Sequence, residues 1–234
     1  MANNADSDAS TNLVSISQEI ISRFDKHSHA RDRALNEGRQ VVRLSANSIR
    51  AVHRGDFDQA SDLLTETEER LRDVIRQLAS YPSIYWAGYV QDAMKEFAEA
   101  KITFAMVHND QIPDPGDLGV EDAPYLNALA EAASEMRREV LDRLREDDQA
   151  EAIRLLDRMN DVYDVLVTID YPDAITGGLR RTTDALRAVL ERSRGDVTIT
   201  LTQKRLEKAL HSAEDRLLSR GQEGSSLSRN DESI

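Results

Sequence analysis

Apolar side chains recur about every 3.6 residues along most of this 234-residue chain, which is the period of an α-helix. The longest such run covers residues 12–54, where isoleucine, leucine, valine and phenylalanine fall on one broad face. Only 10 glycines and 5 prolines are available to interrupt helices. Hydrophobic residues make up 40% of the chain, which is enough to bury a sizeable core. We therefore expect an all-α fold, with a single helical domain over residues 12–218.

Capping and turn residues divide this pattern into separate helices. The first covers residues 12–54, either as one helix or as two joined near residues 27–29, and Gly55 ends it. The second helix is expected to begin at a cap, Asp56 or Asp58, and to end at residue 79, and the third begins after Pro82. The fourth covers residues 124–145, and the fifth runs from a cap at Asp147 or Asp148 to residue 169. The sixth runs from Pro172 to residue 194, and the seventh covers residues 200–218. The break between the last two is expected at Arg194-Gly195-Asp196. The polar ends, residues 1–11 and 219–234, are expected to be disordered.

The charge composition indicates an unusual environment. The chain carries 43 acidic and 30 basic residues, a net charge of −13, and only five of the basic residues are lysines. A surface rich in acids, with arginine in place of lysine, is tolerated in a high-salt cytoplasm because salt screens its self-repulsion. Our hypothesis is a salt-loving host.

Composition also excludes several classes of site. With no cysteine, the chain cannot form a disulfide, a zinc–thiolate cluster or a cysteine nucleophile. No apolar run approaches the roughly 20 residues that cross a bilayer, and the first residues are polar rather than typical of a signal peptide. We expect a cytoplasmic protein with no membrane partner.

Two pairs of glutamates stand out at helical spacing. Glu96 and Glu99, in the stretch KEFAEA, lie three positions apart and share a narrow polar stripe. Glu131 and Glu135 lie four positions apart on the next long helix, flanked by the small residues Ala128 and Ala132. If the two helices pack side by side, the four carboxylates converge, and their mutual repulsion must be offset by a cation or by protons.

Two explanations of these glutamates remain open on spacing alone. Glutamate is among the commonest residues on a solvated helix face, and simple exposure is the better explanation from spacing. The alternative is a metal site, for which clustered oxygen ligands without cysteine or histidine suit Mg²⁺ or Mn²⁺ rather than zinc or copper. A ferritin-like carboxylate bundle is excluded, because the sequence contains no Glu-x-x-His motif.

Four stretches in a fixed order resemble the translin/Trax family, and the resemblance covers about residues 31–208. They are GRQVVRLSANSIRAVHRGD (38–56), YPSIYWAGYVQDAMKEFAEA (81–100), IPDPGDLGVEDAPYLNALAEAASEMRRE (112–139) and DYPDAITGGLRRTTDALRAVLERSRGDVT (170–198). Their order and spacing together are most similar to those of the single-gene archaeal members.

The resemblance implies a seven-helix subunit that assembles into a closed barrel of eight subunits and binds single-stranded RNA, and also single-stranded DNA, inside. Trax-like members are metal-dependent endoribonucleases, whereas translin-like subunits bind nucleic acid without the catalytic acids. Glu96 and Glu99 match the Trax glutamate pair. Glu131 and Glu135 match the second family pair, although Glu131 stands where Trax-type sequences have aspartate.

The expected function is therefore Mg²⁺- or Mn²⁺-dependent endoribonuclease activity, with Glu96, Glu99, Glu131 and Glu135 as metal ligands and catalytic residues. One of the four acts as general base in this scheme. The alternatives are a non-catalytic translin-like protein that binds single-stranded RNA or DNA, and a purely structural helical assembly protein. Six arginines are candidate phosphate contacts, with surface ion pairs as their alternative role: Arg137, Arg138, Arg180, Arg181, Arg192 and Arg194.

Overall fold

The computed structural model describes the backbone of residues 3–227 and the side chains of residues 12–218. Over this range every regular element is a helix and no strand occurs, which confirms the all-α prediction. The long helices are α1 (Asn3–Val52), α2 (Phe57–Gln77), α4 (Gly88–His108), α6 (Asp122–Arg145), α7 (Gln149–Leu166) and α9 (Leu179–Leu227), and the single turns are α3 (Pro82–Tyr85), α5 (Pro115–Leu118) and α8 (Asp173–Thr176).

Local capping sets the starts of α2 and α7 as the sequence predicts. The Asp56 carboxylate accepts a hydrogen bond from the backbone N–H of Gln59 at 3.2 Å. The Asp148 carboxylate accepts one from the backbone N–H of Glu151 at 3.1 Å. Each bond satisfies an N–H group that has no partner inside the helix.

The break predicted at residues 194–196 is wrong, because α9 runs unbroken through Gly195. A glycine inside a helix costs about 1 kcal/mol relative to alanine, and tertiary contacts here outweigh that cost. Ser193 and Val197 are buried on either side of Gly195, and Arg137 of α6 donates hydrogen bonds to Ser193 and to Asp196. The sixth and seventh expected helices are therefore one helix.

Both terminal segments expected to be disordered are helical as far as the backbone is described. Helix α1 begins at Asn3, and α9 ends at Leu227. Helix α1 also continues without a break through residues 27–29, so it is one helix and not two. The rest of the two segments, residues 1–2 and 228–234, lies outside the described residues.

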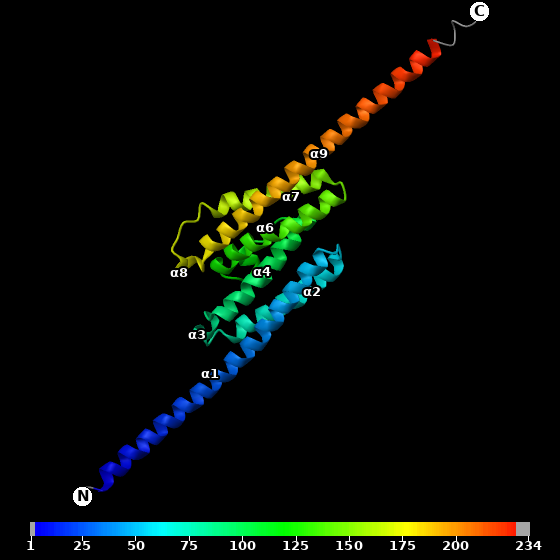
Figure 1. Ribbon diagram of the computed structural model, residues 1–234. Coiled ribbons are helices and arrows are strands. Elements are labelled where there is room, and N and C mark those ends of the chain that lie inside the picture. Colours follow the sequence, from blue (N-terminus) through cyan, green and yellow to red (C-terminus); the bar gives the residue numbers. More distant parts are fainter. Residues whose placement is uncertain (1–2, 228–234) are drawn as a thin grey trace, which may run out of the picture.

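Helix α4 lies at the centre of the bundle. It contacts α1 and α2 on one side and α6 on the other, and α6 in turn contacts α7 and α9 (Figure 1). Phe97, Met94 and Ile102 of α4 are fully buried and belong to a core cluster with members from α1 to α9. None of the described helices is both long and apolar enough to cross a membrane.

Helices α4 and α6 run in the same direction, and this arrangement positions the glutamates. The Tyr85 hydroxyl, beside the start of α4, donates a hydrogen bond to Glu121, and Lys95 of α4 donates one to Glu131. Both contacts join residues 36 positions apart, so the two helices stay in step over three turns. The connection through α5 must return the chain to the start of α4 before α6 begins.

Candidate metal centre

Three carboxylates converge where α4 faces α6. Glu96 and Glu99 reach from α4 and Glu131 reaches from α6, and one oxygen of each lies within 4.8 Å of the others. We call these three residues the carboxylate triad. Glu96 and Glu131 are partly exposed, whereas Glu99 is only 8% exposed. The structure thus brings together three of the four glutamates selected from the sequence.

The environment of Glu99 disfavours its negative charge. Burial raises the pKa of Glu99, and the charges of Glu96 and Glu131 raise it further, to about 8. Lys95 opposes this shift. In the protein without a cation, Glu99 therefore keeps its proton at neutral pH, because a third adjacent negative charge has too little compensation.

A lysine that the sequence analysis did not select lies inside this cluster. The Lys95 Nζ is 2.6 Å from Glu131, 3.1 Å from Glu96 and 3.8 Å from Asp92. Burial alone would lower the pKa of Lys95, but the hydrogen bond and charge of Glu131, with the charge of Glu96, raise it above its usual range. The ammonium is a built-in cation, and the only sequence signal for it is a basic residue directly before Glu96.

Glu135 lies one turn beyond Glu131 on α6 and is bound by a histidine instead of joining the triad. His53, near the end of α1, places Nε2 3.1 Å from Glu135 and Nδ1 3.6 Å from Glu139. These two carboxylates raise the pKa of the buried imidazole to about 9, so it carries a positive charge. The hydrogen bond with His53 lowers the pKa of Glu135, which stays ionised.

Neither His53 nor Glu139 was selected from the sequence. His53 and Glu135 are separated by 82 residues, and no spacing rule links them. Glu139 is almost fully buried, and although burial raises its pKa, His53 and Arg143 lower it overall. Glu139 is therefore held between two cations, His53 at 3.6 Å and Arg143 at 2.9 Å.

The triad suits a hard divalent cation such as Mg²⁺ or Mn²⁺. Its donors are all carboxylate oxygens, the ligand type these ions prefer, and a bound cation would favour the ionised form of Glu99, whose pKa is raised by burial and by the charges of Glu96 and Glu131. Thr103 shares the α4 face of Glu96 and Glu99, is fully buried, and its Oγ1 has no hydrogen-bond partner among the described residues. These observations fit a bound cation better than a plain solvated helix face.

The six arginines selected from the sequence occupy different settings. Arg137 is committed to Ser193 and Asp196, and Arg194 pairs with Glu191 at 2.8 Å. Arg138 is 4.0 Å from Asp142 and lines a hollow of about 420 Å³ together with Glu135. Arg180, Arg181 and Arg192 are exposed on α9 and form no ion pair within the described part of the chain. Arg137 also lines this hollow, but its guanidinium is bound to Ser193 and Asp196, so Arg138 is the more available of the two beside Glu135.

Comparison with known proteins gives relatives over most of the chain. No protein-family profile matches. The protein MJ0175 of Methanocaldococcus jannaschii is 31% identical over 182 residues, which span 77% of this chain and 80% of that protein.

Solved structures give the same result. A complex of AfC3PO with duplex RNA superposes with a TM-score of 0.75 at 30% identity, covering 80% of this chain and 96% of that one. The crystal structure of AfC3PO superposes with a TM-score of 0.74 at 30% identity, covering 80% of this chain and 97% of that one. The crystal structure of apo-NeC3PO superposes with a TM-score of 0.72 at 19% identity, covering 86% of this chain and 98% of that one. At this identity the similarity supports the fold alone. The chain therefore belongs to the translin/Trax family, to which the C3PO proteins belong.

Proposed function

We propose that this protein is a Trax-like, metal-dependent endoribonuclease that hydrolyses phosphodiester bonds of single-stranded RNA. The observation that carries the proposal is the convergence of Glu96, Glu99 and Glu131 within 4.8 Å, with Glu99 buried and short of positive charge. RNA is the proposed substrate because the similar AfC3PO has been crystallised with duplex RNA. The proposed setting is the cytoplasm of a salt-loving archaeal host, where the subunit assembles into a closed barrel of eight that binds single-stranded RNA and DNA.

The triad has the role of holding Mg²⁺ or Mn²⁺. Such an ion, when bound, lowers the pKa of coordinated water and offsets negative charge on the phosphate. The chain supplies two ligands from one helix and one from its parallel neighbour, so that packing of α4 against α6 fixes their relative positions. Lys95 limits the repulsion between Glu96 and Glu131.

Glu135 has the role of general base in this proposal. It is ionised, it lies one turn from Glu131, and the His53 imidazolium orients it through a 3.1 Å contact. A water proton transferred to Glu135 leaves a hydroxide to attack phosphorus, and the P–O bond to the departing ribose oxygen breaks as that oxygen takes up a proton from solvent. Arg138, in the same hollow as Glu135, is positioned to contact a phosphate of the strand.

The test compares binding and cleavage in matched variants. Glu96→Gln and Glu99→Gln each remove one carboxyl group of the triad, and Glu69→Gln, at an exposed position of α2, removes one elsewhere. Mn²⁺ titration calorimetry and cleavage of end-labelled single-stranded and duplex RNA are the measurements. We expect both triad variants to lose metal binding and cleavage while the Glu69 variant keeps both. Unchanged Mn²⁺ affinity in both triad variants would refute the metal site.

A second candidate function is single-strand binding without cleavage, as in translin-like subunits. It is favoured by Lys95, because an ammonium bridging Glu96 and Glu131 partly satisfies the cluster without any metal. This candidate predicts that the wild-type protein retains RNA on a filter but leaves it intact in Mg²⁺, Mn²⁺ and Ca²⁺. The Glu96→Gln variant would then bind RNA as well as the wild type or better, since a negative charge has been removed.

A further inference from the structure

Two helix ends project from the bundle with unpartnered apolar faces. Residues 12–26 of α1 and 205–218 of α9 are exposed throughout, and the two projections extend from opposite ends of the molecule (Figure 1). Neither projection can therefore cover the other within one chain. Their partner must come from outside the subunit.

The exposed face of α1 continues the face that packs in the core. At 100° per residue, Leu13, Ile16 and Ile20 fall on the same side of α1 as Ala34 and Val41, which are buried. Leu13, Ile16, Ile20 and Phe24 are 37% to 69% exposed. We define the α1 strip as Leu13, Ile16, Ile20, Phe24, Ala30 and Ala34.

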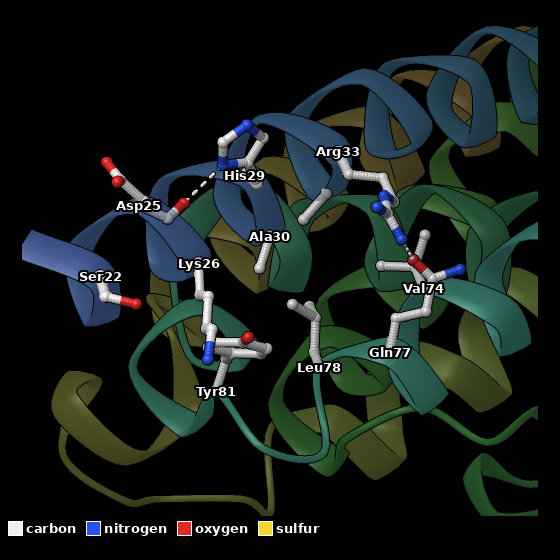
Figure 2. Close-up of a pocket in the computed structure, with 11 residues that line it drawn as sticks. Ser22, Asp25, Lys26, His29, Ala30, Arg33, Val74, Gln77, Leu78 and Tyr81 are labelled. Carbon is white, nitrogen blue, oxygen red and sulfur yellow. Dashed lines mark hydrogen bonds between the residues drawn. The ribbon is translucent and has the colours of Figure 1, made fainter. Parts of the chain in front are cut away.

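The α1 strip leads into a cavity of about 520 Å³ between α1 and the end of α2. Its floor is apolar and includes Ala30, Ala34, Leu78 and the ring of Tyr81, while Lys26 extends down beside Tyr81 (Figure 2). Arg33 lies further along the same rim and donates a hydrogen bond to Gln77 at 3.0 Å. An apolar side chain entering from above would therefore meet apolar surface flanked by two positive groups.

The projecting part of α9 carries a row of leucines on the side away from its own bundle. Leu206, Leu210 and Leu217 are 56% to 69% exposed, and with Ala213 they are spaced four, three and four residues apart, as in a coiled-coil seam. We call these four residues the α9 row. They fall opposite the face that carries buried Val197, so packing in the subunit leaves them uncovered.

We propose that the α9 row of one copy of this protein packs on the α1 strip of a second copy. At 1.5 Å per residue the α1 strip spans about 32 Å and the α9 row about 17 Å, so the row covers about half of the strip. It lies against the half from Phe24 to Ala34, beside Lys26 and Arg33, where its leucines face the cavity.

Charges beside the two surfaces match in sign and spacing. Lys26 and Arg33 lie seven residues apart on one flank of the α1 strip, and Glu207 and Glu214 lie seven apart on one flank of the α9 row. Each pair is therefore about 10 Å apart along its helix. Across the described residues, neither Lys26 nor the two glutamates form an ion pair. Flanking charges of this kind select coiled-coil partners.

Cross-linking between two different single-cysteine proteins tests the contact. The native chain has no cysteine, so full-length Ala30→Cys and Leu210→Cys proteins each carry one thiol. We expect a short bis-maleimide to give covalent dimers in their mixture and none with either variant alone. Ser212→Cys, on the opposite face of the same α9 segment, is the matched control and should fail to link to the Ala30 variant.

Three results would overturn the proposal. They are no dimer in the mixture, dimers of either variant with itself, and equal linking by the Ser212 control. A charge exchange supplies a second measurement. Lys26→Glu with Arg33→Glu should abolish the cross-link, and Glu207→Lys with Glu214→Lys in the other protein should restore it, whereas an unchanged yield in the first variant would contradict the pairing. Both readouts are independent of RNA cleavage.

Discussion

Replacing Glu99 by glutamine should stabilise the metal-free protein at pH 8, although most substitutions of buried residues destabilise a fold. The side chain is 8% exposed and adjoins Glu96 and Glu131, so that its charged form is unfavourable in the folded state. Glutamine keeps nearly the same shape and never ionises. The substitution should therefore increase stability only at pH values at which Glu99 is ionised in the unfolded chain.

The magnitude follows from the pKa of about 8 in the folded protein and the ordinary value of 4.5. Between these pH values the unfolded chain has released the proton and the folded chain keeps it, so stability falls as pH rises. The difference of about 3.5 units, at 1.36 kcal/mol each, gives an upper limit of about 5 kcal/mol. Because water screens the partly exposed Glu96 and Glu131, we expect about 2 to 3 kcal/mol. The penalty is absent below pH 4.5 and complete above pH 8.

Urea unfolding in EDTA at pH 5 and pH 8 measures this effect. The stability of Glu99→Gln minus that of the wild type should increase by about 2 to 3 kcal/mol between the two pH values. The control Glu69→Gln should track the wild type. Adding Mg²⁺ at pH 8 should stabilise the wild type and leave the Glu99 variant unchanged. Parallel pH profiles of wild type and Glu99→Gln would refute the argument.

Three further predictions concern the groups around the triad and the surface. Glu135→Gln should keep its Mn²⁺ affinity, measured by calorimetry, within about threefold of the wild type, while RNA cleavage in a labelled-strand assay falls about 100-fold or more. Loss of both metal binding and cleavage would instead make Glu135 a metal ligand. His53→Gln should cost about 3 kcal/mol at pH 6 in urea unfolding, because the pKa of His53 is raised from 6.5 to about 9. This stabilisation is complete below pH 6.5 and disappears as pH rises through 9, so an equal cost at pH 10 would contradict it. The urea midpoint of the wild type should rise as KCl increases from about 0.1 to 2 M, and greatest stability at low salt would exclude salt adaptation.

Features set by nearby residues were predictable from the sequence. The caps at Asp56 and Asp148 each depend on a bond to a backbone N–H three residues away, so the local sequence contains the whole interaction. The continuity of α9 was not predictable in this way. Gly195 looks like a helix end locally, and the bonds from Arg137 that hold its surroundings in the helix come from another helix.

In the candidate site, too, local features were predictable from the sequence and contacts between helices were not. The spacing of Glu96 and Glu99 places both on one face of α4 whatever the tertiary fold. Glu131 joins them only because α4 and α6 run parallel with a constant offset, which the intervening loop sequence does not reveal. The pairing of His53 with Glu135 depends on where the end of α1 lies against α6, and no residue pattern near His53 indicates it.

The extra methylene of Glu131, relative to the aspartate of Trax-type sequences, has a structural counterpart in Lys95. Glu131 contacts the Lys95 ammonium at 2.6 Å and still offers an oxygen within 4.8 Å of Glu96 and Glu99. Three ionised carboxylates and one ammonium carry a net charge of −2, which one divalent cation neutralises. A second divalent cation would leave an excess of +2 in a partly buried site, and such an excess is unfavourable. If the triad holds a divalent ion as proposed, this charge balance favours one ion over two between α4 and α6.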